Sequence, residues 1–242
     1  MKKLLLGLLL ISSVLSFGAT QRVSSEKLET NESKDILYLA GTKTPYSGEA
    51  EIRYPSGQLL SVATFKNGKI NGKAYEYYPS GQLKLEENYI NGKLNGLSKS
   101  YYENGQLKDE TPYKNDKKEG IVKTYIENGT LISEVTFKNG VVVGKSKLYN
   151  TKTGKLAAES NINNRKIEGV SKEYYPSGKL LSEVRYKNGR VDGIAKVYNE
   201  QTGKLKREIP YKNGKIIDRK VYPLGKDLEN ELLKSETPWQ FH

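Results

Sequence analysis

Side chains that could do chemistry recur along this chain at a nearly constant interval instead of meeting once in a single cluster. Glutamates follow one another 24 or 25 residues apart, and two acid doublets, Glu86-Glu87 and Asp109-Glu110, are the nearest approach to a two-carboxylate catalytic site. Neighbouring residues of a strand point to opposite faces, which separates the carboxylates of each doublet. An active site is normally one concave place, so a lattice of carboxylates argues against an enzyme.

The composition removes most other catalytic chemistry. The chain of 242 residues contains no cysteine and one histidine, His242, which is its last residue. Disulfides, thiolate nucleophiles and cysteine metal sites are therefore excluded, and Ser-His catalysis and multi-histidine metal centres are strongly disfavoured. We expect a non-enzymatic protein with no cofactor and no metal ion.

A row of tyrosines is the first candidate binding surface. Its members stand five residues after a recurring glycine and are Tyr77, Tyr101, Tyr125, Tyr149, Tyr174 and Tyr198. Stacked rings could grip sugars, peptides or lipid headgroups, because tyrosine combines an apolar face with a polar tip. The same rings could instead cover the sheet itself. A second row, adjacent to the first, points to the opposite face and consists of Tyr54, Tyr78, Tyr102 and Tyr175. At least one of the two rows should therefore be accessible to solvent.

Lysines and glutamates form two further rows that are expected to face each other. The rows are Lys99, Lys123, Lys147, Lys172 and Lys196, and Glu86, Glu110, Glu134, Glu159, Glu183 and Glu208. Counting outward from a four-residue turn over residues 79–82 places Tyr75 opposite Glu86 and Lys99 opposite Glu110. Such cross-strand ion pairs stabilise a sheet by about 0.2–1 kcal/mol each and largely cancel each other's field.

The excess positive charge comes mainly from the turns. The chain has 40 Lys and Arg against 28 Asp and Glu, a formal net charge of +12. The candidate ligand residues among the turns are Lys69, Lys93, Lys117, Lys118, Arg190 and Lys215. They are expected to line one long edge, which would attract lipid headgroups, anionic envelope polymers or host glycans, whereas nucleic acid is disfavoured. Lysines also keep an exposed sheet from pairing with another sheet, a role that needs no ligand.

Glycines divide the chain into the units that must position these rows. The leading glycines, from Gly48 to Gly193, follow one another 24 or 25 residues apart. The glycines expected in turns are Gly57, Gly81, Gly105, Gly129, Gly154, Gly178 and Gly203 in one row, and Gly68, Gly92, Gly140, Gly189 and Gly214, in Asn-Gly pairs, in the other. Two units replace the Asn-Gly pair by Asn115-Asp116 and Asn164-Arg165. Because Arg tolerates the left-handed region poorly, the turn at Asn164-Arg165 should be the loosest.

Each unit therefore predicts a hairpin of two strands with a Pro-Ser-Gly type turn at one end and an Asn-Gly turn at the other. We predict an all-β protein, an elongated open antiparallel meander of about seven tandem 24-residue hairpins over residues 36–217. Its strands, about fourteen at ~4.8 Å each, would make a sheet roughly 70 Å long that needs a cap at each end. Residues 36–39 are expected to add an edge strand.

The two ends of the chain predict export and a cap. Residues 1–19 combine Lys2 and Lys3 with an apolar run over residues 4–15 and small residues up to Ala19, as a signal peptide does. A membrane anchor is the alternative, but about 12 apolar residues rise only ~18 Å as a helix, short of a ~30 Å hydrocarbon core. Cleavage near Ala19 would leave a periplasmic, cell-surface or secreted protein. Residues 20–35 predict a flexible linker, and residues 218–242 a short capping helix and tail.

The repeat unit resembles the bacterial variant of the MORN repeat, which is found in proteins often labelled YwqK-family antitoxins. The motif G-x-x-x-x-Y-Y-x-x-G-x-L-x-x-E-x-x-Y-x-N-G-K is carried by residues 72–93, and Pro45-Tyr46-Ser47-Gly48 resembles the entry to the first repeat. The resemblance covers residues 36 to about 223 and implies an open, twisted sheet of hairpins with roles in membrane-proximal scaffolding, lipid contact and protein interaction.

The expected function is thus that of an exported scaffold that mediates protein, lipid-headgroup or glycan interaction at the cell envelope or with an external partner. The alternative is an antitoxin-like protein that neutralises a partner toxin by direct binding. The predicted leader separates the two, because a cytoplasmic toxin would not meet an exported antitoxin.

Overall fold

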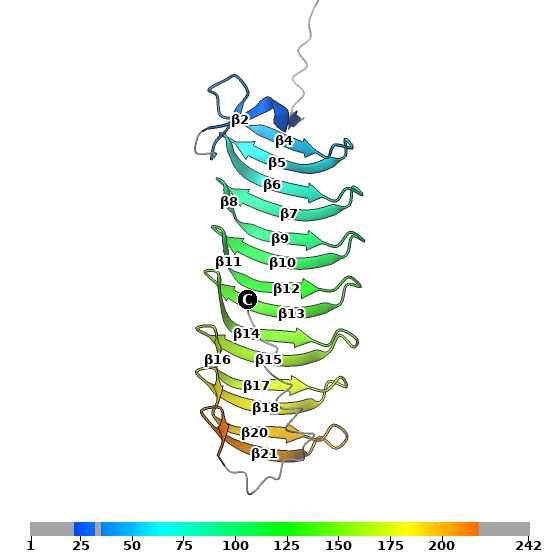
Figure 1. Cartoon of the computed structure of the whole chain (residues 1–242), viewed down its shortest axis with the longest axis vertical. Coiled ribbons are helices and arrows are strands. Elements are labelled where there is room, and N and C mark those ends of the chain that lie inside the picture. Colours follow the sequence, from blue (N-terminus) through cyan, green and yellow to red (C-terminus); the bar gives the residue numbers. More distant parts are fainter. Residues whose placement is uncertain (1–21, 32–34, 218–242) are drawn as a thin grey trace, which may run out of the picture.

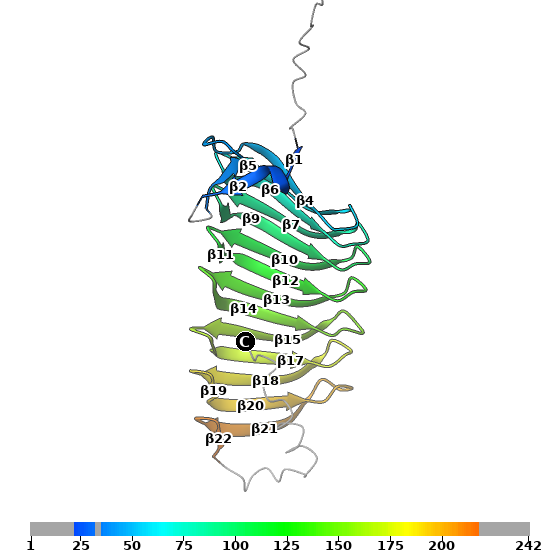
Figure 2. The same ribbon diagram turned by 45° about the horizontal axis from the view of Figure 1, so that its top comes forward.

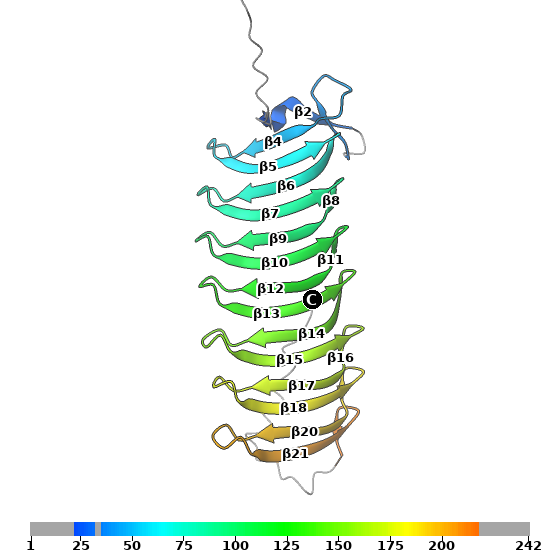
Figure 3. The same cartoon turned by 180° about the vertical axis from the view of Figure 1, so that it is seen from behind.

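The chain forms a long ribbon of β-hairpins stacked side by side (Figure 1). The computed structural model describes residues 22–31 and 35–217. Seen from either side, the long strands lie next to one another along the ribbon (Figures 1 and 3). They belong to one sheet, and two further described strands form a separate sheet. The expected open antiparallel meander is confirmed, whereas the predicted signal peptide and C-terminal helix lie outside the described residues.

Each repeat contributes two long strands. Those of the described residues are β4 (Gly48–Arg53), β5 (Leu59–Lys66), β6 (Lys69–Tyr77), β7 (Leu83–Ile90), β9 (Gly96–Tyr101), β10 (Leu107–Lys114), β12 (Gly120–Tyr125), β13 (Leu131–Lys138), β14 (Val141–Tyr149), β15 (Leu156–Asn163), β17 (Gly169–Tyr174), β18 (Leu180–Lys187), β20 (Gly193–Tyr198) and β21 (Leu205–Lys212). Two-residue strands follow most of the Asn-Gly turns and are β8 (Lys93–Leu94), β11 (Lys117–Lys118), β16 (Lys166–Ile167), β19 (Arg190–Val191) and β22 (Lys215–Ile216). They line one side of the ribbon, as Figure 2 shows for β11, β19 and β22.

The N-terminal end of the ribbon differs from the sequence prediction. Within residues 20–35, predicted to be a flexible linker, the structure has β1 (Arg22–Ser24), the 3-10 turn η1 (Ser25–Lys27) and β2 (Leu28–Thr30). Strand β1 pairs in parallel with β4, and β2 pairs with β3 (Leu37–Leu39). The Arg22 guanidinium lies 3.0 Å from the Glu49 carboxylate and fixes this pairing. This three-residue parallel strand pairs with the otherwise free backbone groups at the edge of β4. It is too short to show a periodic pattern from which it could be predicted.

The Asn-Gly turns join successive repeats. In the first of them, Asn67 and Gly68 have φ of 51° and 76°, the two left-handed conformations of a type I′ turn. In six of the seven such turns of the described residues, the second turn residue donates its N–H to a carbonyl of the preceding repeat. The bond from Gly92 to Ile70, of 2.7 Å, is one example. The turn at Asn164-Arg165 is the exception, in line with the expectation that it is the loosest.

Replacing Arg165 by glycine should stabilise the protein. Arg165 has φ of 61°, a conformation that costs a residue with a Cβ atom about 1 kcal/mol and glycine almost nothing. We expect Arg165→Gly to raise the free energy of unfolding by about that amount, measured by urea denaturation. The matched control is Asp116→Gly, which removes a carboxylate that accepts a hydrogen bond from the Leu94 N–H at 2.8 Å. Its free energy of unfolding should rise by less than that of Arg165→Gly, or fall. A loss of stability in Arg165→Gly would contradict this explanation.

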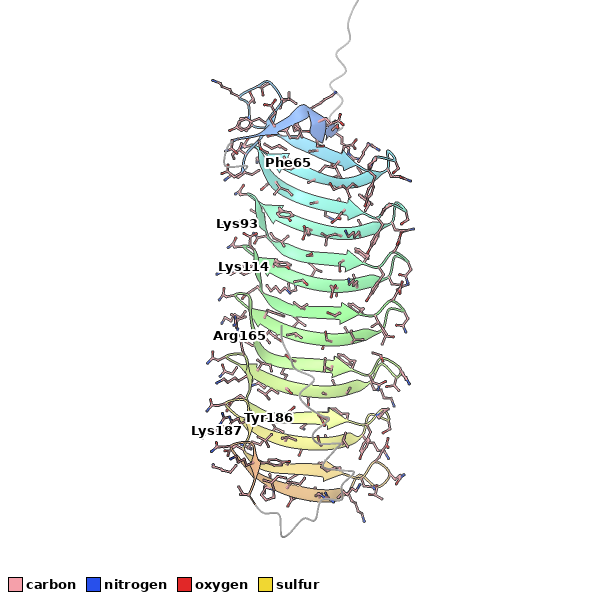
Figure 4. All side chains as sticks on the ribbon, in the orientation of Figure 1. Phe65, Lys93, Lys114, Arg165, Tyr186 and Lys187 are labelled. Atoms are coloured by element: carbon pink, nitrogen blue, oxygen red, sulfur yellow. The ribbon has the colours of Figure 1, made fainter. Side chains whose placement is uncertain are left out.

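The apolar core is a spine that follows the long axis on one face of the sheet, which we call the groove face. Each repeat contributes two side chains to the spine. One is the aromatic or isoleucine residue shortly before the Asn-Gly turn, and the other is its cross-strand partner after the turn. Its members are Phe65, Tyr89, Tyr113, Phe137, Ile162, Tyr186 and Tyr211, opposite Ile70, Leu94, Lys118, Val142, Ile167, Val191 and Ile216. Figure 4 shows Phe65 and Tyr186 over the ribbon, whereas Lys93 and Lys114 lie along its edge.

The second tyrosine row holds neighbouring repeats together. Tyr78 donates its hydroxyl hydrogen to the backbone carbonyl of Tyr101, one repeat on, at 2.8 Å. The same bond recurs from Tyr54 to Tyr77, from Tyr102 to Tyr125 and from Tyr175 to Tyr198. These rings are half-buried, and their hydroxyl groups are engaged in the fold.

Candidate functional site

The face opposite the groove face carries an alternating row of glutamates and lysines, and we call it the ladder face. The predicted pairs are confirmed: Tyr75 lies opposite Glu86, and Lys99 opposite Glu110. The cross-strand partners then continue without interruption down the ribbon, in the order Glu86, Lys99, Glu110, Lys123, Glu134, Lys147, Glu159, Lys172, Glu183, Lys196 and Glu208. Because each charge inside the row stands between two of opposite sign, the row of six glutamates and five lysines is close to electrical balance.

The candidate tyrosine row lies on the same face, and four of its six members donate hydrogen bonds to the glutamates. The hydroxyl of Tyr149 donates to Glu134 Oε2 at 2.8 Å, and that of Tyr174 donates to Glu159 Oε1 at 3.0 Å. Tyr125 and Tyr198 repeat the contact with Glu110 and Glu183. All six members of the row, Tyr77, Tyr101, Tyr125, Tyr149, Tyr174 and Tyr198, are half-buried. Sequence reasoning treated the tyrosines and glutamates as separate rows, whereas the fold brings them together across neighbouring repeats.

These contacts raise the pKa values of the phenols. Burial raises the pKa of Tyr149 and that of Tyr174 to about 12, and the hydrogen bonds to Glu134 and Glu159 add to the shift. The phenols therefore remain hydrogen-bond donors at any physiological pH. Their contacts match those of a charge-balanced structural surface.

The raised pKa values predict a loss of stability in strong alkali. Below the ordinary tyrosine pKa of 10.0, both phenols are protonated in the folded and unfolded states, and their hydrogen bonds stabilise the fold in full. As the pH rises from 10 through 12, the unfolded state releases these protons first, so the free energy of unfolding falls. The measurement is the urea midpoint between pH 8 and 12, alongside tyrosinate absorbance. Glu134→Gln should lower the pKa of Tyr149, and ionisation near pH 10 in the parent protein would contradict the geometry.

Positive charge gathers where the Asn-Gly turns stack, along what we call the turn edge. We define this edge as residues 66–71, 90–95, 114–119, 138–143, 163–168, 187–192 and 212–217. It carries thirteen basic and four acidic side chains, a net of nine positive charges out of the chain's +12. The opposite side of the ribbon, the tip edge, comprises residues 54–58, 78–82, 102–106, 126–130, 150–155, 175–179 and 199–204. It carries four basic and three acidic side chains.

Like charges face each other directly along the turn edge. Cross-strand partners are Lys66 with Lys69, Lys114 with Lys117, Lys187 with Arg190, and Lys212 with Lys215. Such pairs are destabilising. Of the basic side chains of this edge, Lys212 alone forms an ion pair within the described residues, with Asp192 at 3.3 Å. Acidic side chains of the edge are engaged by backbone instead, as where the Asn139 N–H donates to Glu119 at 2.6 Å.

Five of the six basic residues predicted to bind a ligand lie on the turn edge, and the sixth faces the groove. Lys69, Lys93, Lys117, Arg190 and Lys215 are exposed on the turn edge. Lys118 is not: it pairs with Tyr113 in the spine, is half-buried, and places its ammonium 5.1 Å from the centre of the Phe137 ring. Strand alternation turns Lys118 toward the groove face because Lys117, its neighbour, points outward.

Exposed aliphatic side chains lie beside the turn edge, and sequence reasoning missed them. Leu97, Ile121, Val170 and Ile194 each follow a leading glycine on the ladder face and are 40 to 50% exposed. Ile90, at the edge itself, is 57% exposed. The signal was present as an apolar residue directly after four of the seven leading glycines, at Gly96, Gly120, Gly169 and Gly193. The edge is therefore both basic and apolar.

The predicted turn glycines take the conformations that such turns need. Each of the twelve has a positive φ, between 67° and 90°. Among residues 22–31 and 35–217, no group of three or more Asp, Glu or His side chains could hold a metal ion. That part of the chain also has no helix long and apolar enough to cross a membrane.

Comparison with known families matches the chain to the MORN repeat variant over most of its repeats. The matching segments are residues 46–67, 70–91, 94–115, 118–139, 167–188 and 191–213. Together they make up more than half of the chain. The unmatched unit between residues 139 and 167 is the one that contains the turn at Asn164-Arg165. No curated protein matches the chain. MORN repeats are generally non-catalytic binding scaffolds, and this chain belongs to the MORN repeat variant family.

Proposed function

We propose that this protein is an exported, non-enzymatic scaffold that binds an anionic lipid surface of the cell envelope through its turn edge. The observation that carries the proposal is the concentration of nine net positive charges on that edge, against one on the tip edge. The hairpins repeat about every 9.6 Å, twice the strand spacing. A straight array of basic clusters suits a surface with many anionic groups better than a single small ligand.

The aliphatic row favours lipid over a soluble polyanion. Leu97, Ile121, Val170 and Ile194 place exposed apolar side chains next to unpaired lysines. Peripheral membrane proteins combine these two features, because basic side chains attract anionic headgroups while apolar ones enter the boundary of the acyl chains. A polymer such as an anionic glycan would use the charges alone.

The ladder face and the composition support a non-enzymatic role. The Tyr-Glu-Lys contacts recur from repeat to repeat and balance one another, so they offer no unique acid or base. Export rests on the predicted signal peptide, residues 1–19. Fractionation of cells that express the chain with a C-terminal tag tests it, and an uncleaved cytoplasmic product would contradict export.

Vesicle sedimentation tests the proposed ligand. The full chain should bind vesicles that contain phosphatidylglycerol and should leave pure phosphatidylcholine vesicles unbound. Binding should weaken steeply with added salt, since the Debye length shrinks from about 10 Å at 0.1 M to about 3 Å at 1 M. Equal affinity for both kinds of vesicle would overturn the proposal. Failure to bind either, with salt-insensitive capture of one protein partner, would favour the antitoxin-like alternative.

A further inference from the structure

A hollow opens on the turn edge between the first two Asn-Gly turns, the turn that joins β5 to β6 and the turn that joins β7 to β8. Its volume is about 570 Å³, within the range of about 300–1,000 Å³ that is common for small-ligand sites. Two lysines and three asparagines line it: Lys66, Asn67, Lys69, Asn71 and Asn91. Among the residues that the structure describes, no carboxylate lines it. The hollow is therefore surrounded by ammonium and carboxamide groups.

The two lysines of the hollow carry charge that the fold leaves uncompensated. Lys66 and Lys69 are cross-strand partners, so their ammonium groups repel each other. Both side chains are exposed, and neither forms an ion pair within residues 22–31 and 35–217. An anion with two negative charges, placed between them, would relieve this repulsion.

Asn71 adds a hydrogen-bond donor to the same hollow. Its Oδ1 accepts a hydrogen bond from the Asn91 N–H at 2.9 Å, and this bond ties the second turn to the preceding repeat. Because the bond uses the oxygen, the group left for a ligand is the NH2 donor, which has no hydrogen-bond partner within the described part of the chain. The side-chain NH2 groups of Asn67 and Asn91 have no partner there either. Each of the three carboxamides can thus donate to an anion.

Further along the turn edge, the position of Asn71 is acidic beside two of the like-charged pairs. Glu119 accepts the Asn139 N–H at 2.6 Å, and Asp192 accepts the Asn213 N–H at 3.3 Å, so the structural bond is the same as that of Asn71. Each carboxylate also offsets part of the charge of the like-charged pair beside it, and these pairs are Lys114 with Lys117 and Lys187 with Arg190. A bound anion would meet a negative charge at both places.

The interval after the second Asn-Gly turn keeps an asparagine but has only one lysine in its cross-strand pair. That pair is Ile90 with Lys93. Asn95 takes the position of Asn71, but its Nδ2 donates to Asn115 Oδ1 at 3.3 Å. Among the described intervals between Asn-Gly turns, the first alone combines two opposed basic side chains with a lining free of carboxylates.

We propose that this hollow binds a phosphate monoester. Such a group carries a charge of about −1.5 to −2 at neutral pH and three strong acceptor oxygens, which match two ammonium groups and the carboxamide donors around them. Lysine binds phosphate as a point charge, so the site needs no forked arginine. The inference deepens the proposed function and rests on it for one source of the ligand, a lipid whose headgroup ends in a phosphate. The other source is a soluble phosphate monoester.

The site itself is tested without a membrane, by NMR titration of the isotope-labelled full chain with glycerol 3-phosphate. We expect saturable shifts in the side-chain amide signals of Asn67, Asn71 and Asn91. In Asn71→Asp the affinity should fall at least about tenfold, because a donor to a charged group is replaced by a like charge. The variant keeps the oxygen that accepts the Asn91 N–H, as Asp192 does in its own repeat.

Two further variants make the titration specific. The matched control is Asn128→Asp on the tip edge, where Oδ1 also accepts a backbone N–H, that of Thr130 at 2.9 Å, and its affinity should equal that of the parent. The reciprocal variant is Asp192→Asn, which removes the carboxylate beside a like-charged pair and should add saturable shifts at Asn188 and Asn213. A parent protein without saturable shifts, or an Asn71→Asp variant with the affinity of the parent, would overturn the proposal.

Vesicles separate the two sources of the phosphate. Phosphatidic acid ends in a phosphate monoester, whereas phosphatidylglycerol contains a phosphate diester, and the two kinds of vesicle are matched in surface charge. The parent should bind phosphatidic acid more tightly, and Asn71→Asp should lose this preference. Equal affinity for both lipids, with binding of glycerol 3-phosphate intact, would overturn the lipid source and assign the site to soluble phosphate monoesters. Binding of glycerol 3-phosphate without binding to either vesicle would support the site and overturn the proposed lipid function.

Discussion

Replacing Gly68 by alanine is expected to lower the free energy of unfolding by about 3 kcal/mol, the sum of backbone strain and overpacking. Gly68 has φ of +76°, in the left-handed region of the first Asn-Gly turn. A Cβ atom there would stand 2.5 Å from Ile36 Cγ2 and 2.8 Å from the Leu37 carbonyl oxygen. The backbone oxygen has no room to withdraw, because the Leu37 N–H donates to the Gly68 carbonyl at 2.8 Å.

The matched control is Gly214→Ala in the last Asn-Gly turn. Gly214 has a similar φ, +80°, but no atom of residues 22–31 or 35–217 lies within 4 Å of the site of its Cβ. The free energy of unfolding of Gly214→Ala should fall only by the cost of the left-handed conformation, about 1 kcal/mol. Urea denaturation of the two variants separates strain from packing. Equal losses would mean that the N-terminal residues 36–37 do not pack on the first turn.

Charge reversal on the turn edge is expected to abolish binding to anionic vesicles. The variant replaces Lys66, Lys114 and Lys187 by glutamate, one member of three of the four like-charged pairs. Each lysine near an anionic membrane contributes about 1 kcal/mol, so the loss of three weakens binding on the order of 100-fold before any repulsion is counted. Stability should hold or rise slightly, since each substitution turns a Lys–Lys or Lys–Arg pair into an ion pair.

The control variant makes the same change of charge on the tip edge. It replaces Lys152, Lys179 and Lys204 by glutamate, three exposed residues of the tip loops. Vesicle binding by this variant should stay within a few-fold of the parent. If both variants lose affinity equally, net charge and not the turn edge governs binding, and the proposed surface is wrong.

The sequence predicted the parts of the fold that depend on local pattern. The glycine interval and the Asn-Gly pairs were enough for the hairpin array, and counting from the tip turn placed Lys99 opposite Glu110. Local chemistry also marked the turn at Asn164-Arg165, which lacks the bond that its six counterparts make to the preceding repeat. These features are fixed within a repeat or two, where turn type determines register.

What escaped prediction depends on contacts between repeats. The bond from Tyr149 to Glu134 joins residues 15 apart: Glu134 lies opposite Lys147 across β13 and β14, and Tyr149 stands two residues beyond Lys147 on the same face. The parallel pairing of β1 with β4 spans 27 residues. Lys118 was grouped with its neighbours by charge, although strict alternation turns it inward onto Phe137. Charge and spacing were thus enough to predict the basic turn edge, but not the direction in which each of its side chains points.

The most direct test places one fluorophore at a time on the cysteine-free chain and adds anionic vesicles. An environment-sensitive label at Ile90→Cys, on the turn edge, should shift to the blue and become protected from aqueous quenchers. The same label at Ser80→Cys, on the tip edge, should keep the spectrum that it has in buffer. A shift at Ser80→Cys without one at Ile90→Cys would contradict the claim that this ribbon meets its ligand along the stacked Asn-Gly turns.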